Sequence, residues 1–229
     1  MTLMFGMTEK PALLLDENTQ ITEGIMYQFY YAPGSCSLAA QIALEMSGAP
    51  YQCVKLDFRS NAQRESGYLT INPKGRVPAL VCEQGVITEN PAILLFLAQQ
   101  FPDAGLAPLK DPFKLAQINA FNAYLSSTVH PAHAHGVRGY RWADDEAAIA
   151  EMKRKMPEVM TECFGMIESE MFKGPWVMGE DFSISDIYLF TIAQWLEADG
   201  VDITEFPKVM SHRSRMRDLE VVKKVLAEQ

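Results

Sequence analysis

The residues around Cys36 have the types and the order that thiol chemistry requires. An aromatic segment ends at Tyr31, a Pro-Gly turn follows, and Cys36 then stands between Ser35 and Ser37. A thiol is a nucleophile only as its thiolate, and the free amides and dipole of a helix N-terminus lower a thiol pKa. The phenol of Tyr30 or of Tyr31 and the two serine hydroxyls could stabilise a thiolate by hydrogen bonding. We predict a reactive or thiol-binding turn here; the alternative is a cysteine packed in a first helical turn.

Two later segments offer what a peptide-like thiol ligand needs. The backbone of Val77, next to Pro78, is expected to be extended, so its amide and carbonyl can pair with a ligand in strand fashion. At a predicted helix start, the carboxylate of Glu89 can hold an amino group, and Asn90 with the helix amides can hold a carboxylate. The alternative for this second segment is an ordinary helix cap.

Three histidines, His130, His133 and His135, stand close together in the sequence and raise the question of a metal site. On a helix His130 and His133 share a face, whereas His135 points away from it, and Pro131 would distort this turn. Since metal ligands must converge on one point, we expect no metal site here.

The segments that position these residues alternate between strand and helix patterns in the first half of the chain. Strands are expected at residues 26–31, 51–57 and 77–81 and in a hairpin at 82–87, and helices at 38–46, weakly at 59–68, and from about 91 to 100. Ser35 is the expected N-cap of the first helix, and Ser47-Gly48 closes it. A helix separates the first two strands, so these strands should be parallel. The order β-α-β-α-β-β-α predicts a small α/β domain with a mixed sheet.

The second half of the chain has helical patterns and no strand signal. A boundary falls near residues 102–112, which gives a domain at 26–102 and an all-α domain at 112–229, while residues 1–25 match no element. In the sequence from Phe182 to Ile187, Ser183 and Asp186 form a capping box, which predicts a helix over 184–198.

Composition and charge exclude several classes of function. The 229 residues are 48% hydrophobic, and 20 basic against 29 acidic residues give a formal charge of -9, which repels nucleic acid and anionic membranes. No apolar stretch reaches the ~20 residues of a membrane helix, and since the first residues lack the basic start of a signal peptide, we expect no secretion. The four cysteines form no C-x-x-C pair, so we expect free thiols and a cytoplasmic protein. The short run from Arg138 to Trp142 therefore indicates a pocket wall or a solvated turn rather than a nucleic-acid patch.

The motifs Tyr-Tyr-x-Pro-Gly-x-Cys-Ser-Leu, Asn-Pro-Lys-Gly-x-Val-Pro-Ala-Leu and Thr-Glu, followed by the capping motif at 182–186, occur here in one order. This order resembles that of the soluble glutathione transferases, specifically the bacterial beta class, from Met26 to the C-terminus. The resemblance implies a thioredoxin-like domain that binds glutathione as co-substrate, a helical domain that binds a small, mostly apolar electrophile, and a homodimer.

The resemblance also implies roles for single residues. Cys36 would lie beside the glutathione sulfur with Tyr31 and Ser37 as neighbours, and His130 would point into the site from the helical domain. Ser35, Val77, Pro78, Glu89 and Asn90 would contact glutathione. We further place Tyr140 or Trp142 near the electrophile.

Two departures from the family pattern bear on these roles. Asn90 replaces the usual serine, and segment 59–63 lacks the lysine that the class tends to carry, which leaves the contact to the glycyl end of glutathione open.

Three functions fit these residues. In the first, bound glutathione ionises and attacks an electrophilic carbon, which makes the protein a glutathione transferase. In the second, Cys36 itself reduces glutathione mixed disulfides; since no resolving cysteine is near, only monothiol exchange is open to it. In the third, the protein binds a ligand on the same fold without catalysis.

Overall fold

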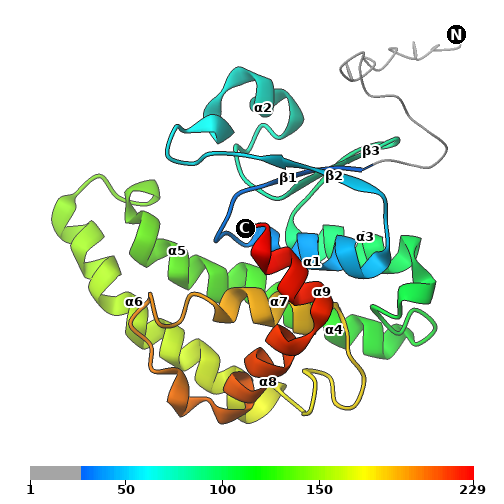
Figure 1. Cartoon of the computed structure of the whole chain (residues 1–229). Helices are drawn as coiled ribbons and strands as arrows, with labels where there is room; N and C mark the ends of the chain where they lie inside the picture. Colours follow the sequence, from blue (N-terminus) through cyan, green and yellow to red (C-terminus); the bar gives the residue numbers. More distant parts are fainter. Residues whose placement is uncertain (1–26) are drawn as a thin grey trace, which may run out of the picture.

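The computed structural model describes residues 27–229 (Figure 1), so the extension expected at residues 1–25 lies outside the described residues. In the described part, a four-stranded sheet has the order β2-β1-β3-β4. Its strands are β1 (Tyr27–Tyr31), β2 (Tyr51–Lys55), β3 (Ala79–Cys82) and β4 (Gly85–Thr88). β1 is parallel to β2 and antiparallel to β3, and β3 and β4 form a hairpin. The mixed sheet is therefore confirmed, although β2 ends two residues earlier than predicted and β3 begins two residues later.

Helices cover both faces of this sheet (Figure 1). They are α1 (Ser37–Ser47) and α3 (Asn90–Gln100) on one face and the short η1 (Ala62–Arg64) and α2 (Ser66–Ile71) on the other. Because successive side chains of a strand point to opposite faces, Phe29 and Tyr31 enter the main core with α1, whereas Tyr30 packs against Tyr68 of α2. This alternation decides which tyrosine of the strand can approach the turn at Cys36.

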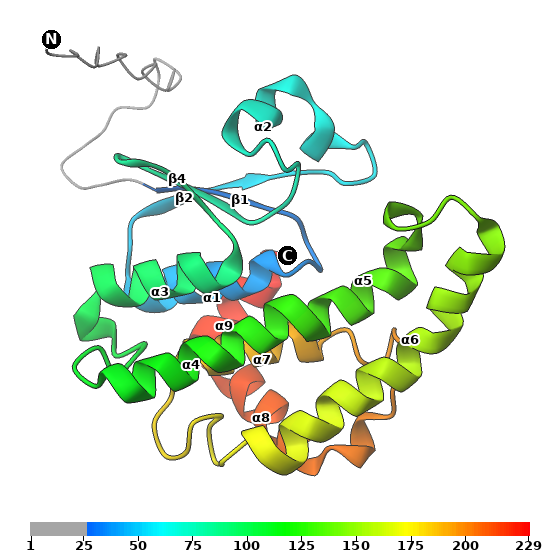
Figure 2. The ribbon, with the colours of Figure 1, turned by 180° about the vertical axis from the view of Figure 1, so that it is seen from behind.

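Helices make up the second half of the chain, as predicted. They are η2 (Pro102–Ala104), α4 (Pro112–Tyr124), η3 (Leu125–Val129), α5 (His130–Arg138), η4 (Gly139–Arg141), α6 (Glu146–Met166), η5 (Ile167–Met171), α7 (Ile184–Ala193), η6 (Ile203–Glu205), α8 (Pro207–Asp218) and α9 (Glu220–Ala227). Figure 2 shows α1 and α3 between the sheet and this helical layer, with α5 and α6 extending past the sheet. The predicted thioredoxin-like domain plus all-α domain is confirmed.

α4, η3 and α5 follow one another without a break, and η3 is a π-helical turn. Pro131 lies just after it and carries no backbone N–H, so it cannot donate to the preceding turn, and its ring needs extra room there. A wider π turn provides that room and is frequent at functional sites. The distortion expected from Pro131 therefore takes this form.

α7 begins at the predicted capping box, in which Ser183 and Asp186 bond to each other's backbone. It ends at Ala193, not at residue 198. The side chain of Gln194 donates its Nε2–H to the carbonyl of Phe190 at 2.9 Å. If the helix continued, this carbonyl would accept from the backbone N–H of Gln194 instead. The chain turns tightly instead, and Trp195 is thereby placed beyond the helix.

The C-terminal helix α9 ties the two domains together. Val222 and Val225 are fully buried in the core cluster that also contains α1 residues. Around them, Lys224 forms an ion pair with Glu45, and Gln41 donates its Nε2–H to the carboxylate of Glu228 at 3.1 Å. No helix in residues 27–229 is long and apolar enough to cross a membrane.

Candidate functional site

A cavity of about 140 Å³ lies where the two domains meet. Six of the predicted site residues line this cavity: Cys36, Val77, Pro78, Glu89, Asn90 and His130. They come from the start of α1, the loop before β3, the start of α3 and the start of α5. The tertiary structure thus brings together segments that are up to about a hundred residues apart in the sequence.

Cys36 stands at the N-cap position of α1 and forms one wall of the cavity. Its Sγ donates to the carbonyl of Val77 at 3.5 Å, and Asn90 donates its Nδ2–H to the Cys36 carbonyl at 2.8 Å. Burial raises the pKa of the Cys36 thiol to about 12, and the charge of Arg138 lowers it by a smaller amount. The expectation of a lowered pKa is therefore wrong, because burial outweighs the effect of the helix start.

The two serine hydroxyls beside Cys36 are used within the turn. Ser37 Oγ is completely buried and accepts from the amide of Ala32 at 3.2 Å. Ser35 Oγ lies 2.6 Å from Ser37 Oγ and donates to the Ala32 carbonyl at 2.7 Å. Cys36 occupies the N-cap position of α1 and makes no side-chain cap bond, whereas Ser35 Oγ accepts from the amide of Ser37, the first residue of α1, at 3.2 Å and so acts as the capping side chain. Both hydroxyls brace the turn and neither lines the cavity.

Tyr31 also does not reach the cavity. Its place in β1 turns its ring into the main core, where it stacks on Phe29 with centroids 6.1 Å apart. Its hydroxyl donates to the backbone carbonyl of Glu228 at 3.4 Å, near the C-terminus. Strand alternation therefore removes Tyr31 from the group predicted around the thiol.

Val77 and Pro78 are joined by a cis peptide bond and lie in the loop that leads into β3. The carbonyl of Val77 accepts from Cys36, as described above, and both residues line the cavity. β3 starts only at Ala79, so Val77 is outside the sheet ladder and its amide faces no strand. The backbone expected to pair with a ligand is therefore available at the cavity wall.

Glu89 and Asn90 meet the cavity at the start of α3. Glu89 has a backbone φ of +74°, which residues other than glycine rarely adopt. Such strained backbone conformations are often found at functional sites. Its carboxylate pairs with Lys74. Asn90 is almost fully buried, and its Oδ1 has no hydrogen-bond partner in residues 27–229. This free acceptor fits an N–H group of a bound ligand.

His130 faces the cavity from the first residue of α5. Its ring packs on Trp195 with centroids 5.0 Å apart. Burial lowers the pKa of His130 to about 4, so the ring is neutral at pH 7. A neutral imidazole in this place can donate or accept one hydrogen bond without bringing a charge.

The other two predicted histidines point elsewhere. His133 Nδ1 bonds both carboxylate oxygens of Asp199 at 2.8 and 2.9 Å, and His135 Nδ1 lies 2.7 Å from the carbonyl of Pro131. Within residues 27–229, no group of three or more His, Cys, Asp or Glu side chains could hold a metal ion.

Comparison with known proteins assigns the family. The glutathione S-transferase N-terminal domain pattern matches residues 26–99, and the C-terminal domain pattern matches residues 92–220. The chain belongs to the glutathione S-transferase family. The glutathione S-transferase GstA of Escherichia coli O157:H7 is 30% identical over 202 residues, which cover 83% of this chain and 96% of that protein. The resemblance read from the motifs is thus confirmed.

Solved structures agree with this assignment. A glutathione transferase homologue from Sulfitobacter with bound glutathione is 43% identical, has a TM-score of 0.86, and covers 89% of this chain and 98% of its own. The bacterial beta-class transferase of Sphingomonas chungbukensis is 32% identical, with a TM-score of 0.77 and coverage of 88% and 98%. This glutathione transferase therefore shares the whole two-domain architecture with these proteins.

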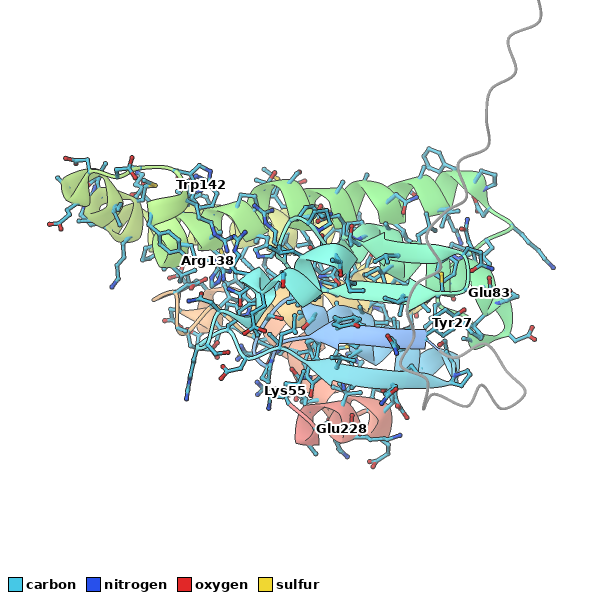
Figure 3. The ribbon with its side chains drawn as sticks, turned by 90° about the horizontal axis from the view of Figure 1, so that it is seen from above. Tyr27, Lys55, Glu83, Arg138, Trp142 and Glu228 are labelled. Atoms are coloured by element: carbon cyan, nitrogen blue, oxygen red, sulfur yellow. The ribbon has the colours of Figure 1, made fainter. Side chains whose placement is uncertain are left out.

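The cavity of this glutathione transferase has further lining residues that the sequence did not assign to a site. Arg76 and Tyr188 are the principal ones, and the cavity is also lined by Arg141 and by Trp142, which was expected near the electrophile. Arg141 and Trp142 confirm that the run after α5 is a pocket wall, whereas Tyr140 is 65% exposed and does not line the cavity. Figure 3 shows Arg138 and Trp142 together at one end of the molecule. Tyr188 gave no separate signal, because it lies inside the apolar run of α7.

A second, wider hollow of about 510 Å³ lies between the end of α1, the start of β2 and α9. It is lined by Glu45, Tyr51, Cys53 and Lys224, among others, and by none of the predicted site residues. Glu45 there is already bonded to both Tyr51 and Lys224. The smaller cavity at Cys36 is therefore the candidate active site.

Proposed function

We propose that this glutathione transferase binds glutathione with its sulfur beside Cys36 and transfers it to a small electrophile. The observation that supports this is the meeting of Cys36, Val77, Glu89, Asn90 and His130 at one cavity. Val77 would pair with the cysteinyl backbone, and Glu89 would hold the amino group of the γ-glutamyl end. Asn90 Oδ1 would accept a ligand N–H.

In the proposed reaction the thiol of bound glutathione loses its proton and the resulting thiolate attacks an electrophilic carbon. Cys36 remains a protonated thiol because of its raised pKa, so its S–H can turn from the Val77 carbonyl to donate a hydrogen bond to the glutathione sulfur. Neutral His130 can donate a second hydrogen bond from the helical domain. Hydrogen bonds from these two donors favour the thiolate over the thiol.

Calorimetric titration with glutathione and a conjugation assay with an aryl halide test this proposal. Glu89→Gln should weaken glutathione binding about tenfold, as expected for the loss of a charge-assisted hydrogen bond. Glu83→Gln is the matched control, because Glu83 is an exposed glutamate at the hairpin turn. No heat of binding and no conjugation by the wild-type protein would refute the proposal.

The rival activity is glutathione-dependent disulfide reduction by Cys36, which is favoured by the free thiol in the cavity wall. Cys36→Ser and Cys36→Ala separate the two activities. We expect conjugation to be retained in both variants, since the attacking sulfur belongs to glutathione, but to be slower in Cys36→Ala, which lacks a side-chain donor to that sulfur. Loss of disulfide reduction together with retained conjugation would restrict Cys36 to exchange. A non-catalytic binding protein would instead bind ligands and show neither activity.

We also propose that the protein acts as a homodimer in the cytoplasm. The family resemblance supports the dimer, and the four cysteines, which are all free thiols, support a reducing compartment. Light scattering coupled to size-exclusion chromatography should give twice the 25.7 kDa mass of one chain.

A further inference from the structure

Three arginines gather at the candidate active site of a chain whose formal charge is -9. Arg76 and Arg141 line the cavity directly. Burial is the main cause that lowers the pKa of His130, and the charges of Arg138, Arg76 and Arg141 add to it. Arg76 and Arg141 share the cavity lining with His130, whereas Arg138, three residues before Arg141, does not line the cavity. Such a cluster gives one cavity of an acidic protein a positive potential.

These arginines have no counter-ion in the described part of the chain. Arg154 and Arg213 each pair with a glutamate, whereas no ion pair in residues 27–229 involves any of the three at the cavity. Glu89, the acidic residue of the cavity lining, pairs with Lys74.

Arg138 is the arginine of the three that has a buried polar atom without a hydrogen-bond partner in the described residues. The residue is half-buried, and the atom is its Nε. Burying an N–H of a guanidinium without an acceptor is costly, and a carboxylate is the acceptor whose planar geometry fits it. Arg138 does not itself line the cavity, so it adds an uncompensated positive charge behind the wall formed by Arg141 and Trp142, and this charge favours an anion in the cavity.

A carboxylate in this cavity could belong to glutathione or to the acceptor. Arg76 directly precedes Val77, on the side where the glutathione backbone is proposed to bind. Arg138 and Arg141 stand on the helical domain instead, next to Trp142. The Trp142 ring packs on His135 with centroids 4.2 Å apart and is 48% exposed, so it offers a flat apolar surface beside the two charges.

We propose that the acceptor of this enzyme is a planar, conjugated or aromatic electrophile that carries a carboxylate, which is bound by Arg141 beside Trp142, with the charge of Arg138 adding to the attraction. The inference rests on the proposed glutathione transfer and adds the class of substrate. It replaces the mostly apolar acceptor expected from the sequence.

The test compares 4-fluoro-3-nitrobenzoate with its methyl ester. In both, the glutathione sulfur bonds to the carbon that carries fluorine, the carbon–fluorine bond breaks, fluoride leaves, and the thiol proton passes to solvent. Each kcat/KM is divided by the uncatalysed rate constant, which removes the difference in intrinsic reactivity. We expect the acid to be preferred at least about tenfold, and added salt to weaken only the reaction of the acid.

Arg141→Gln should lower kcat/KM for the acid more than for the ester and so abolish this preference, and Arg141→Lys should restore part of it. Lys153→Gln, which removes one charge from an exposed position on α6, should leave the preference intact. A raised KM for glutathione in Arg141→Gln, with both acceptors slowed equally, would assign the arginines to glutathione and overturn the proposal.

Binding to the glutathione-saturated enzyme gives a second measurement that does not depend on turnover. By calorimetry, 3-nitrobenzoate should bind more tightly than methyl 3-nitrobenzoate, and Arg141→Gln should remove the difference. Equal binding of the two compounds, or no binding of either, overturns the anionic acceptor. Failure to bind glutathione at all, by contrast, would refute the proposed function itself.

Discussion

At the level of single residues, burial controls the chemistry of the cavity. A helix start favours a thiolate by a modest amount that is limited to the first turn, whereas removal of a thiol from water disfavours the thiolate by several pKa units. Burial raises the pKa of Cys36 to about 12 and lowers that of His130 to about 4. Both groups are therefore neutral at pH 7, and the arginines supply the charge in the site.

Alkylation should report the raised pKa of Cys36. At pH 7 the thiolate fraction is very small, so we expect iodoacetamide to react with Cys36 much more slowly than with free cysteine, and the rate to rise tenfold per pH unit through pH 9. Peptide mass spectrometry resolves Cys36 from Cys53, Cys82 and Cys163. An apparent pKa near 8 or below would contradict this assignment.

The lowered pKa of His130 predicts a loss of stability in acid. Between the unfolded pKa of about 6.5 and the folded value of about 4, the unfolded chain binds a proton that the folded chain does not, so stability falls as pH falls. His130→Asn removes this contribution. Urea unfolding at pH 7 and pH 4.5 should show a smaller loss in the variant, by about 1–2 kcal/mol. Identical losses would mean that His130 titrates normally.

At the level of elements, the site depends on how closely α5 and α6 pack. Gly136 of α5 faces Met156 of α6, and a Cβ placed on Gly136 would lie 2.0 Å from Met156 Sδ and 2.7 Å from its Cβ. A glycine is therefore required by close approach rather than by its backbone angles. α5 ends at Arg138, and the segment that directly follows it carries Arg141 and Trp142 of the cavity wall. A shift of α5 would therefore move this wall.

Gly136→Ala should destabilise the protein by about 1–3 kcal/mol, as expected for overpacking. Gly165→Ala is the matched control on α6, where an added Cβ meets no atom within 4 Å and removal of a helical glycine should be neutral or slightly stabilising. Chemical denaturation measures both. Equal stability of the two variants would show that α5 and α6 can separate without cost.

At the level of the whole molecule, one tryptophan links the helical domain to the thiol turn. Trp195 donates its indole N–H to the carbonyl of Gly34 at 3.1 Å, two residues before Cys36. The same ring stacks on His133 with centroids 4.2 Å apart, and His133 is held by Asp199. The position of the turn is therefore set by residues of both domains.

Trp195→Phe removes the indole N–H and keeps an aromatic ring between the histidines. We expect a loss of stability of about 1 kcal/mol for the hydrogen bond, together with weaker glutathione binding, because the turn before Cys36 is held less firmly. Trp176→Phe provides a control, since Trp176 packs on Phe182 and lies outside the cavity lining. Unchanged glutathione affinity in Trp195→Phe would separate the domain contact from the site.

The sequence by itself predicted most of the elements and six residues that line the candidate cavity. Periodicity, the Gly48 stop, the hairpin glycine and the capping box of Ser183 and Asp186 are local signals that act within a few residues, so they fix strands and helices before any packing. Motif order then identified Cys36, Val77, Glu89 and Asn90.

Only the tertiary structure decided what depends on distant residues. Whether the pKa of Cys36 is raised or lowered depends on its burial by other segments. The Tyr31 hydroxyl donates to the carbonyl of Glu228, which is 197 positions away in the sequence. Likewise, Arg76 and Arg141 form one charged wall only because the loop before β3 faces the end of α5. Local patterns carry no information on such contacts, since burial and charge are properties of the assembled fold.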